Sequence, residues 1–189
     1  FSEIASIKNT TLGTRLYQRV ADRGKLTVDY FNINEFRRGG NKFDLPMHET
    51  DITESVTHAI NSGAVAYDVL LRDEDKLALF FAAQGVNRDS YYGANQDLSA
   101  YGKTTDFTYS SGIQYIRSIN YLFFSPASLT TGIEMNGGNL NDKKLGYYDP
   151  VEDKHYGNTL VADQKMTTQA AFLQSEWKMS KAVLTAGVR

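Results

Sequence analysis

Apolar and polar residues alternate along most of this chain with a period of two. Leu26, Val28 and Tyr30 alternate with Thr27 and Asp29. Because successive side chains of a β-strand point to opposite faces, this pattern predicts strands with one apolar and one polar face. The same alternation recurs in residues 106–117, 127–136, 168–178 and 182–189.

Residues 51–61 also fit helical spacing, with Ile52, Val56 and Ile60 on one side. They continue into a β-branched and aromatic run at 64–70, which favours a strand. We predict eight strands, at about 13–21, 25–35, 53–71, 76–88, 105–117, 127–136, 168–178 and 182–189. The predicted apolar face carries Val65, Tyr67, Val69, Phe107, Tyr109, Ile113, Leu129, Ile133, Leu173, Trp177 and Leu184.

Short and long connections alternate between the predicted strands. Short ones fall at 22–25, 72–75 and 179–181, long ones at 36–52, 89–104 and 137–167, and an intermediate one at 118–126. Outer-membrane barrels have short turns on one side and long loops on the other. Several strands reach the roughly 9–11 residues that cross a bilayer at a tilt. The expected fold is therefore all-β, an antiparallel up-and-down meander of about eight strands that forms part of a transmembrane β-barrel.

The composition of the chain excludes several classes of function. The 189 residues include no Cys, which excludes disulfides and Cys-ligated zinc. The net charge of −2 lacks the strongly basic character of a dedicated nucleic-acid binder, so no nucleic-acid partner is expected. No run approaches the roughly 18 apolar residues of a membrane-spanning helix. The chain starts at Phe1 without Met and stops inside a predicted strand, so we expect a segment of a larger protein.

Two segments carry the most specific sequence, NEFRRGGNKFDLPMHETDITE at 34–54 and RDSYYGANQDLSAYGKTT at 88–105. Near the end come FLQSEW at 172–177 and LTAGVR at 184–189. Together these motifs resemble TonB-dependent outer-membrane receptors, especially those of Bacteroidetes-type bacteria. The resemblance covers most of the chain in the order that the barrel of that family would show.

The resemblance implies a barrel of roughly 22 strands closed by an N-terminal plug domain. Such a receptor sits in the bacterial outer membrane and imports a siderophore, a cobalamin-like cofactor or a glycan, with energy from the TonB complex. Residues 1–189 would be a plug-free piece of the barrel wall that contacts outer-membrane lipid and a small nutrient ligand. The TonB complex would act through the plug domain. The alternative is a complete small eight-stranded barrel that serves as an anchor or adhesin.

Five residues are candidates for substrate-binding loops. Arg37 and Arg38 present forked guanidinium groups that suit an anionic ligand, although neighbouring carboxylates are the more ordinary partners of such a pair. His48 lies beside Glu49 and Asp51, a polar loop in the plainer interpretation. Tyr91 and Tyr92 fit either a stacking loop or the aromatic girdle of a barrel.

No catalytic residues, metal site or cofactor are predicted. No Ser lies in G-x-S-x-G and no second His follows His48 at metal-site spacing, so an enzyme is not expected. His58 is expected on the polar, lumenal face, and His155 in a solvated loop. Loop calcium near 139–142 and 149–153 stays open, since turn chemistry explains the same residues. In the absence of a membrane, we expect the sheet either to curl so that its apolar side chains turn inward, or to associate edge to edge or through its apolar faces.

Overall fold

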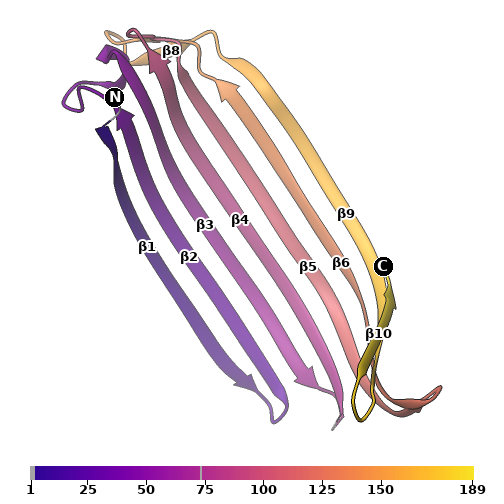
Figure 1. The fold of residues 1–189 in the computed structure, drawn as a ribbon. Coiled ribbons are helices and arrows are strands. Elements are labelled where there is room, and N and C mark those ends of the chain that lie inside the picture. The colour runs from indigo at the N-terminus through magenta and orange to yellow at the C-terminus, as the bar shows by residue number, and fades with distance from the viewer. Residues whose placement is uncertain (1–2, 73) are drawn as a thin grey trace.

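A computed structural model describes residues 3–72 and 74–189 of the chain. Its main feature is one antiparallel eight-stranded sheet in the order β1-β2-β3-β4-β5-β6-β9-β10, so the predicted all-β meander is confirmed (Figure 1). The strands are β1 Glu3–Val20, β2 Gly24–Gly40, β3 Ile52–Leu70, β4 Asp75–Ala94, β5 Tyr101–Leu122, β6 Ser125–Lys144, β9 Thr159–Lys178 and β10 Val183–Val188.

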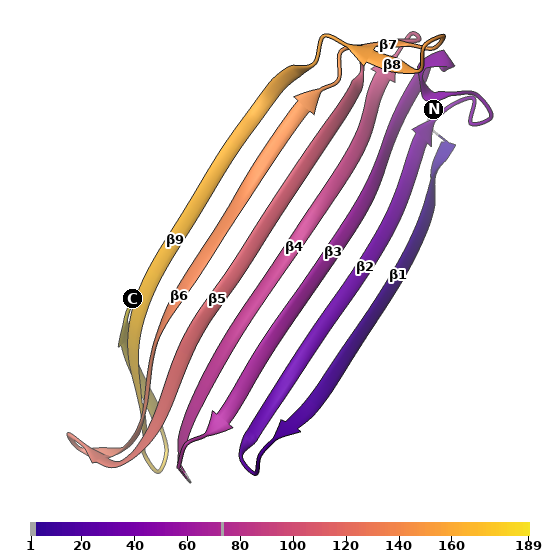
Figure 2. The ribbon, with the colours of Figure 1, turned by 180° about the vertical axis from the view of Figure 1, so that it is seen from behind.

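Three smaller elements lie at the end of the sheet where the long connections gather. They are the 3₁₀ turn η1, Met47–Glu49, and the two short strands β7, Tyr147–Asp149, and β8, Lys154–Tyr156, which form a hairpin. Figures 1 and 2 show this hairpin lying across the ends of the long strands. In the part of the chain that the structure describes, no helix is long or apolar enough to span a membrane.

The strand register separates the side chains onto two faces. Tyr67 lies opposite Leu79, Leu79 opposite Ile113, and Ile113 opposite Ile133. We call this side face A and the other side face B. By the register, all eleven residues predicted for one apolar face lie on face A, which confirms that prediction. Face B carries ion pairs between Arg15 and Asp29, Lys76 and Asp68, and Arg189 and Glu134.

Face A is mostly apolar in the half of the sheet next to the short turns, where Asp75 and Arg117 lie opposite each other at its outer margin. Going along β5 toward the long connections, the face A side chains are Tyr115, Ile113, Ser111, Tyr109 and Phe107, and polar residues follow. We call these apolar rows the apolar band. Beyond it, the neighbouring strands place on face A the polar residues Asn32, Asn34, Asn61, Asn87, Asp89, Lys103, Thr105, Asn139 and Asn141.

Several predicted boundaries were wrong, mostly at the long-connection end. β9 starts at Thr159 instead of 168, and β4 and β5 leave only residues 95–100 between them. The connection expected at 118–126 is a two-residue turn between Leu122 and Ser125. The backbone ladder continues where both faces are polar, so alternation could not mark these strand ends. With these corrections, the β5–β6 connection joins the short ones, and the long connections still alternate with short ones but are shorter than predicted.

The sheet is a single layer with two open edges. β1 and β10 form its two margins, and they do not pair with each other. β10 covers β9 only from Leu173 to Lys178, so the remainder of the β9 edge has no partner strand among the described residues (Figure 2). With no second layer, the buried apolar residues of the described chain are Tyr91, Ala127 and Trp177.

Candidate functional site

The three long connections converge on one end of the sheet. They comprise residues 41–51, 95–100 and 145–158, the last containing β7 and β8. The backbone N–H of Tyr148 donates to the carbonyl of Leu98 at 2.9 Å, which ties the last connection to the middle one. The N–H of Gln96 donates to the carbonyl of Thr50 at 3.2 Å, which ties the middle one to the first. The connections therefore form one unit.

Five rings lie where these connections meet, and we call them the aromatic–histidine cluster: His48, Tyr91, Tyr101, Tyr148 and His155. His48 Nδ1 lies 2.8 Å from the Tyr101 hydroxyl, within hydrogen-bonding distance. The Tyr148 ring centroid lies 5.0 Å from that of His48 and 5.0 Å from that of His155. Tyr101 contacts Tyr148 at 5.4 Å and His155 at 5.0 Å. Tilted and edge-on rings at these separations attract one another.

Tyr91 forms the base of the cluster. Its side chain is 1% exposed, and its ring meets that of Tyr101 edge-on at 4.8 Å. Its hydroxyl donates to the carbonyl of Asp97 at 2.9 Å, so the buried polar atom is satisfied. A Cβ at Gly93 would lie 2.4 Å from that hydroxyl, so the absence of a side chain there gives Tyr91 its place.

Arg38 joins the base through the sheet register. Arg38 lies opposite Ser55, Ser55 opposite Tyr91, and Tyr91 opposite Tyr101, so one row of face A supplies all four. The Arg38 guanidinium donates to the carbonyl of Leu45 at 2.7 Å and lies over the Phe43 ring at 5.8 Å. Arg38 therefore braces the first connection from beneath.

Electrostatics in the cluster favour the neutral phenol. Burial raises the pKa of Tyr101 to about 12, with Tyr91 and Tyr148 adding to the effect and Arg38 opposing it. Burial also raises the pKa of Tyr91. The Tyr148 hydroxyl donates to Asp153 at 2.8 Å, and this contact raises the pKa of Tyr148. The cluster thus holds protonated tyrosine hydroxyls as hydrogen-bonding groups.

The five predicted site residues divide between the two faces. Arg38, His48 and Tyr91 come together in or beside the cluster. Arg37 and Tyr92 lie on face B, since neighbours in a strand alternate. Arg37 Nε pairs with Glu35 Oε1 at 2.8 Å, and Tyr92 is 52% exposed. The structure therefore brings three of the five residues together.

Three members of the cluster were missed by sequence reasoning. Tyr101 and Tyr148 were not singled out, and His155 was expected in a solvated loop. That expectation was wrong, because His155 packs on Tyr101 and Tyr148 and its Nδ1 is buried, with no hydrogen-bond partner among the described residues. Tyr101 could have been found from its place opposite Tyr91 in a hairpin. Tyr148 and His155 reach the site by a long-range fold of 145–158, for which the sequence has no local signal.

The remaining histidine and the acidic neighbours of His48 each lie near a different partner. His58 lies on face B as expected, 3.6 Å from Glu35. Asp51 pairs with Lys42 at 2.8 Å, and Glu49 is 3.9 Å from His48. Within residues 3–72 and 74–189, no three His, Asp or Glu side chains converge on a common point where a metal ion could bind.

No protein-family model matches the chain, and no curated protein sequence matches it. The resemblance to TonB-dependent receptors therefore stays a prediction from the motifs quoted above.

Alkaline pH is expected to open the cluster. The folded pKa of Tyr101, about 12, lies above the value of roughly 10 for an unfolded tyrosine. The folded cluster therefore keeps the proton longer, and its stabilisation is complete below about pH 10 and lost as the pH rises to about 12. Tyrosinate absorbance and near-ultraviolet circular dichroism should change together in this window. In Tyr101→Phe the part of this transition that belongs to Tyr101 should disappear, so the amplitude should fall; superimposable titrations of the variant and the wild type would contradict the assignment.

Proposed function

We propose that this chain is a segment of the wall of a TonB-dependent receptor in the bacterial outer membrane. In this proposal face A contacts lipid, face B lines the lumen, and the aromatic–histidine cluster lies on the outside, where the receptor meets a small nutrient ligand. The observation that carries the proposal is the apolar band on face A and its abrupt polar end. The motifs at 34–54 and 88–105 are the reason to propose a TonB-dependent receptor among outer-membrane barrels.

The height of the apolar band fits a bilayer. The nine residues from Phe107 to Tyr115 extend about 30 Å along β5, at roughly 3.3 Å per residue. A strand tilt of about 40° reduces this to about 23 Å, close to the roughly 25 Å apolar belt of outer-membrane barrels. The strands continue beyond the band with polar residues on both faces, as expected for a part that projects into water.

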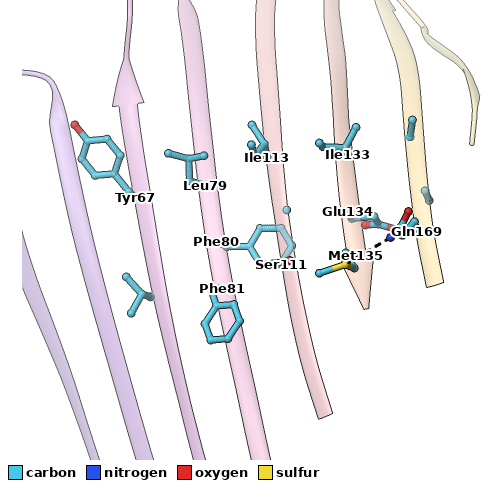
Figure 3. Close-up of a pocket in the computed structure, with 14 residues that line it drawn as sticks. Tyr67, Leu79, Phe80, Phe81, Ser111, Ile113, Ile133, Glu134, Met135 and Gln169 are labelled. Atoms are coloured by element: carbon cyan, nitrogen blue, oxygen red, sulfur yellow. Dashed lines mark hydrogen bonds between the residues drawn. The ribbon is translucent and has the colours of Figure 1, made fainter. Parts of the chain in front are cut away.

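The apolar residues of the band are exposed in this single-layered sheet. Ile133 is 59%, Phe81 50% and Leu173 46% exposed. Figure 3 shows Leu79, Ile113 and Ile133 side by side on three neighbouring strands, lining an apolar hollow with Tyr67. Soluble monomers seldom expose a contiguous apolar surface of this kind, so lipid is the environment that suits it.

The open edges favour a wall segment over a complete small barrel. An eight-stranded barrel requires its first and last strands to pair, and β1 and β10 lie at opposite margins of the sheet. The reading frame around this chain tests the receptor class: an upstream plug domain and downstream strands ending in an aromatic residue are expected. A stop codon directly after Arg189 would count against it.

Tryptophan placement tests the lipid contact. Phe80 and Phe81 are neighbours on β4 that point to face B and face A, and they are 40% and 50% exposed. With Trp177→Phe as background, we expect a tryptophan introduced by Phe81→Trp to be quenched by lipids brominated in mid-chain. One introduced by Phe80→Trp should instead be quenched by aqueous acrylamide. Equal quenching of the two positions would refute a lipid-facing face A.

A further inference from the structure

Face B has an uncharged zone in the middle of the sheet. The zone consists of two adjoining rows of residues that the strand register places side by side from β1 to β9. Arg15 and Asp29 are the charged members of these rows, and they pair with each other at the β1 side. The other members are Gly13, Phe31, Ser62, Ala64, Ala82, Gln84, Thr108, Ser110, Asn136, Gly138, Met166 and Thr168. The zone therefore offers a ligand no unpaired charge.

The surface of the uncharged zone is hollow. A cavity of about 600 Å³ extends from Phe31 on β2 to Met166 on β9, and most of the side chains that line it belong to face B. Small residues form its floor, among them Ala64, Ala82 and Gly138. Because these residues rise little above the backbone, they leave room over the sheet. The volume lies in the range of roughly 300–1,000 Å³ that is usual for small-molecule sites.

Six hydroxyl and amide side chains of the uncharged zone have no hydrogen-bond partner among the described residues. They are Ser62, Gln84, Thr108, Ser110, Asn136 and Thr168. Amides on face A behave differently, since Asn34 Nδ2 donates to Asn32 Oδ1 at 2.7 Å and Asn32 Nδ2 donates to Asn61 Oδ1 at 2.9 Å. Hydroxyl and amide groups can both donate and accept hydrogen bonds. The six side chains therefore match a ligand whose own groups also donate and accept.

Phe31 adds an aromatic surface beside these polar groups. It lies opposite Gly13, and a Cβ at Gly13 would lie 2.5 Å from the Phe31 ring. The ring thus occupies the space that a side chain at position 13 would take, which holds it in place across β1. Phe31 nevertheless stays 39% exposed on a largely polar face. An aromatic ring of this kind suits the apolar C–H face of a sugar ring.

We infer that the uncharged zone is a subsite on the lumen wall for an uncharged, hydroxyl-rich ligand, namely a neutral sugar. Its hydroxyl and amide groups exchange hydrogen bonds with the sugar hydroxyls, and Phe31 covers the apolar side of the sugar ring. A charged chelate would leave its own charge without a partner here, which costs free energy. The inference rests on the proposed function, in which face B lines the lumen, and it selects the glycan from the three nutrient classes.

Oligosaccharide binding by the complete receptor tests the subsite. The receptor, purified in a detergent without a sugar headgroup, is applied to an array of neutral, sialylated and sulfated oligosaccharides. We expect neutral oligosaccharides to bind. Gln84→Leu should weaken this binding about fivefold or more through lost hydrogen bonds. Phe31→Ala should weaken it about tenfold or more, whereas Phe31→Tyr keeps the ring and should bind as the wild type does.

Two variants on face A are the matched controls. Asn87→Leu removes an amide from β4, and Tyr30→Ala removes an aromatic ring from β2, both from the opposite face. Their oligosaccharide binding should equal that of the wild type. Absence of binding to any neutral oligosaccharide, or wild-type binding by both Gln84→Leu and Phe31→Ala, would overturn the inference. A lower thermal midpoint of these two variants with unchanged binding would also overturn it, because the zone would then pack against the plug domain.

The lipid test separates this inference from the proposed function. If the tryptophan introduced by Phe81→Trp is quenched in mid-bilayer while no neutral oligosaccharide binds, the subsite fails and the proposed function stands. If Gln84→Leu and Phe31→Ala weaken oligosaccharide binding while that tryptophan is not quenched, face B remains a sugar-binding surface and the membrane-spanning wall is removed.

Discussion

Ile113→Arg is expected to destabilise, in a fluid bilayer, the complete barrel to which we propose that this chain belongs. Ile113 is 43% exposed on face A, between Leu79 and Ile133 and near the middle of the apolar band. An arginine on the lipid face at the bilayer midplane costs about 2–4 kcal/mol. The equilibrium between inserted and unfolded barrel should therefore shift by roughly 30-fold to 1000-fold. Urea titration of the complete barrel in phosphatidylcholine vesicles measures this shift.

The adjacent residue provides a matched control. Gln114 points to face B, opposite Gly132 on β6. Gln114→Arg places the same charge one residue along the same strand, and in a water-filled lumen it should change insertion by less than about threefold. Equal losses in the two variants would show that arginine harms the sheet itself, and face A would then not be a lipid surface.

The sequence predicted the two faces better than the ends of the strands. The alternation of apolar and polar positions was enough to place Val65, Ile113 and Leu173 on one face of the sheet. A strand that is buried or faces lipid on one side has to be apolar at every second position. β9 begins nine residues before the predicted start, in a stretch where Asp163 and Lys165 share face A with Asn139 and Asn141. Hydrogen bonds between strands do not depend on side-chain polarity, so the ladder continues without a hydrophobic signal.

The pairing register of neighbouring strands predicts which candidate residues of the strands lie together. It does not predict contacts that the long connections make. Arg37 and Arg38 are adjacent in one strand, and therefore no extended backbone could aim both at one ligand. Arg38 and Tyr91 share a row with Tyr101, which follows once β2, β3, β4 and β5 pair as neighbours. Tyr148 and His155 join the cluster because a distant connection folds back across the end of the sheet. A contact between parts of the chain that are far apart in sequence leaves no periodic pattern of apolar and polar residues.

Tyr91→Ala is expected to release the long connections from one another. Tyr91 has the largest fully buried side chain among the described residues, and its hydroxyl satisfies the carbonyl of Asp97. Removing a buried aromatic ring of this size costs about 3–5 kcal/mol, through lost burial and the cavity that remains. The loss should be local, because the other aromatic rings of the cluster lie at the same end of the sheet.

Native-state amide exchange measures this local release. The amides of Gln96 and Tyr148, which donate to Thr50 and Leu98, should exchange at least about 100-fold faster in Tyr91→Ala. The amide of Leu71, at the opposite end, should be unchanged. Tyr92→Ala removes the same side chain from the next position, where it is half exposed on face B, and it should change all three rates by less than about threefold. Comparable acceleration in both variants would mean that Tyr91 is not the base of the cluster and that the connections are held by their backbone hydrogen bonds alone.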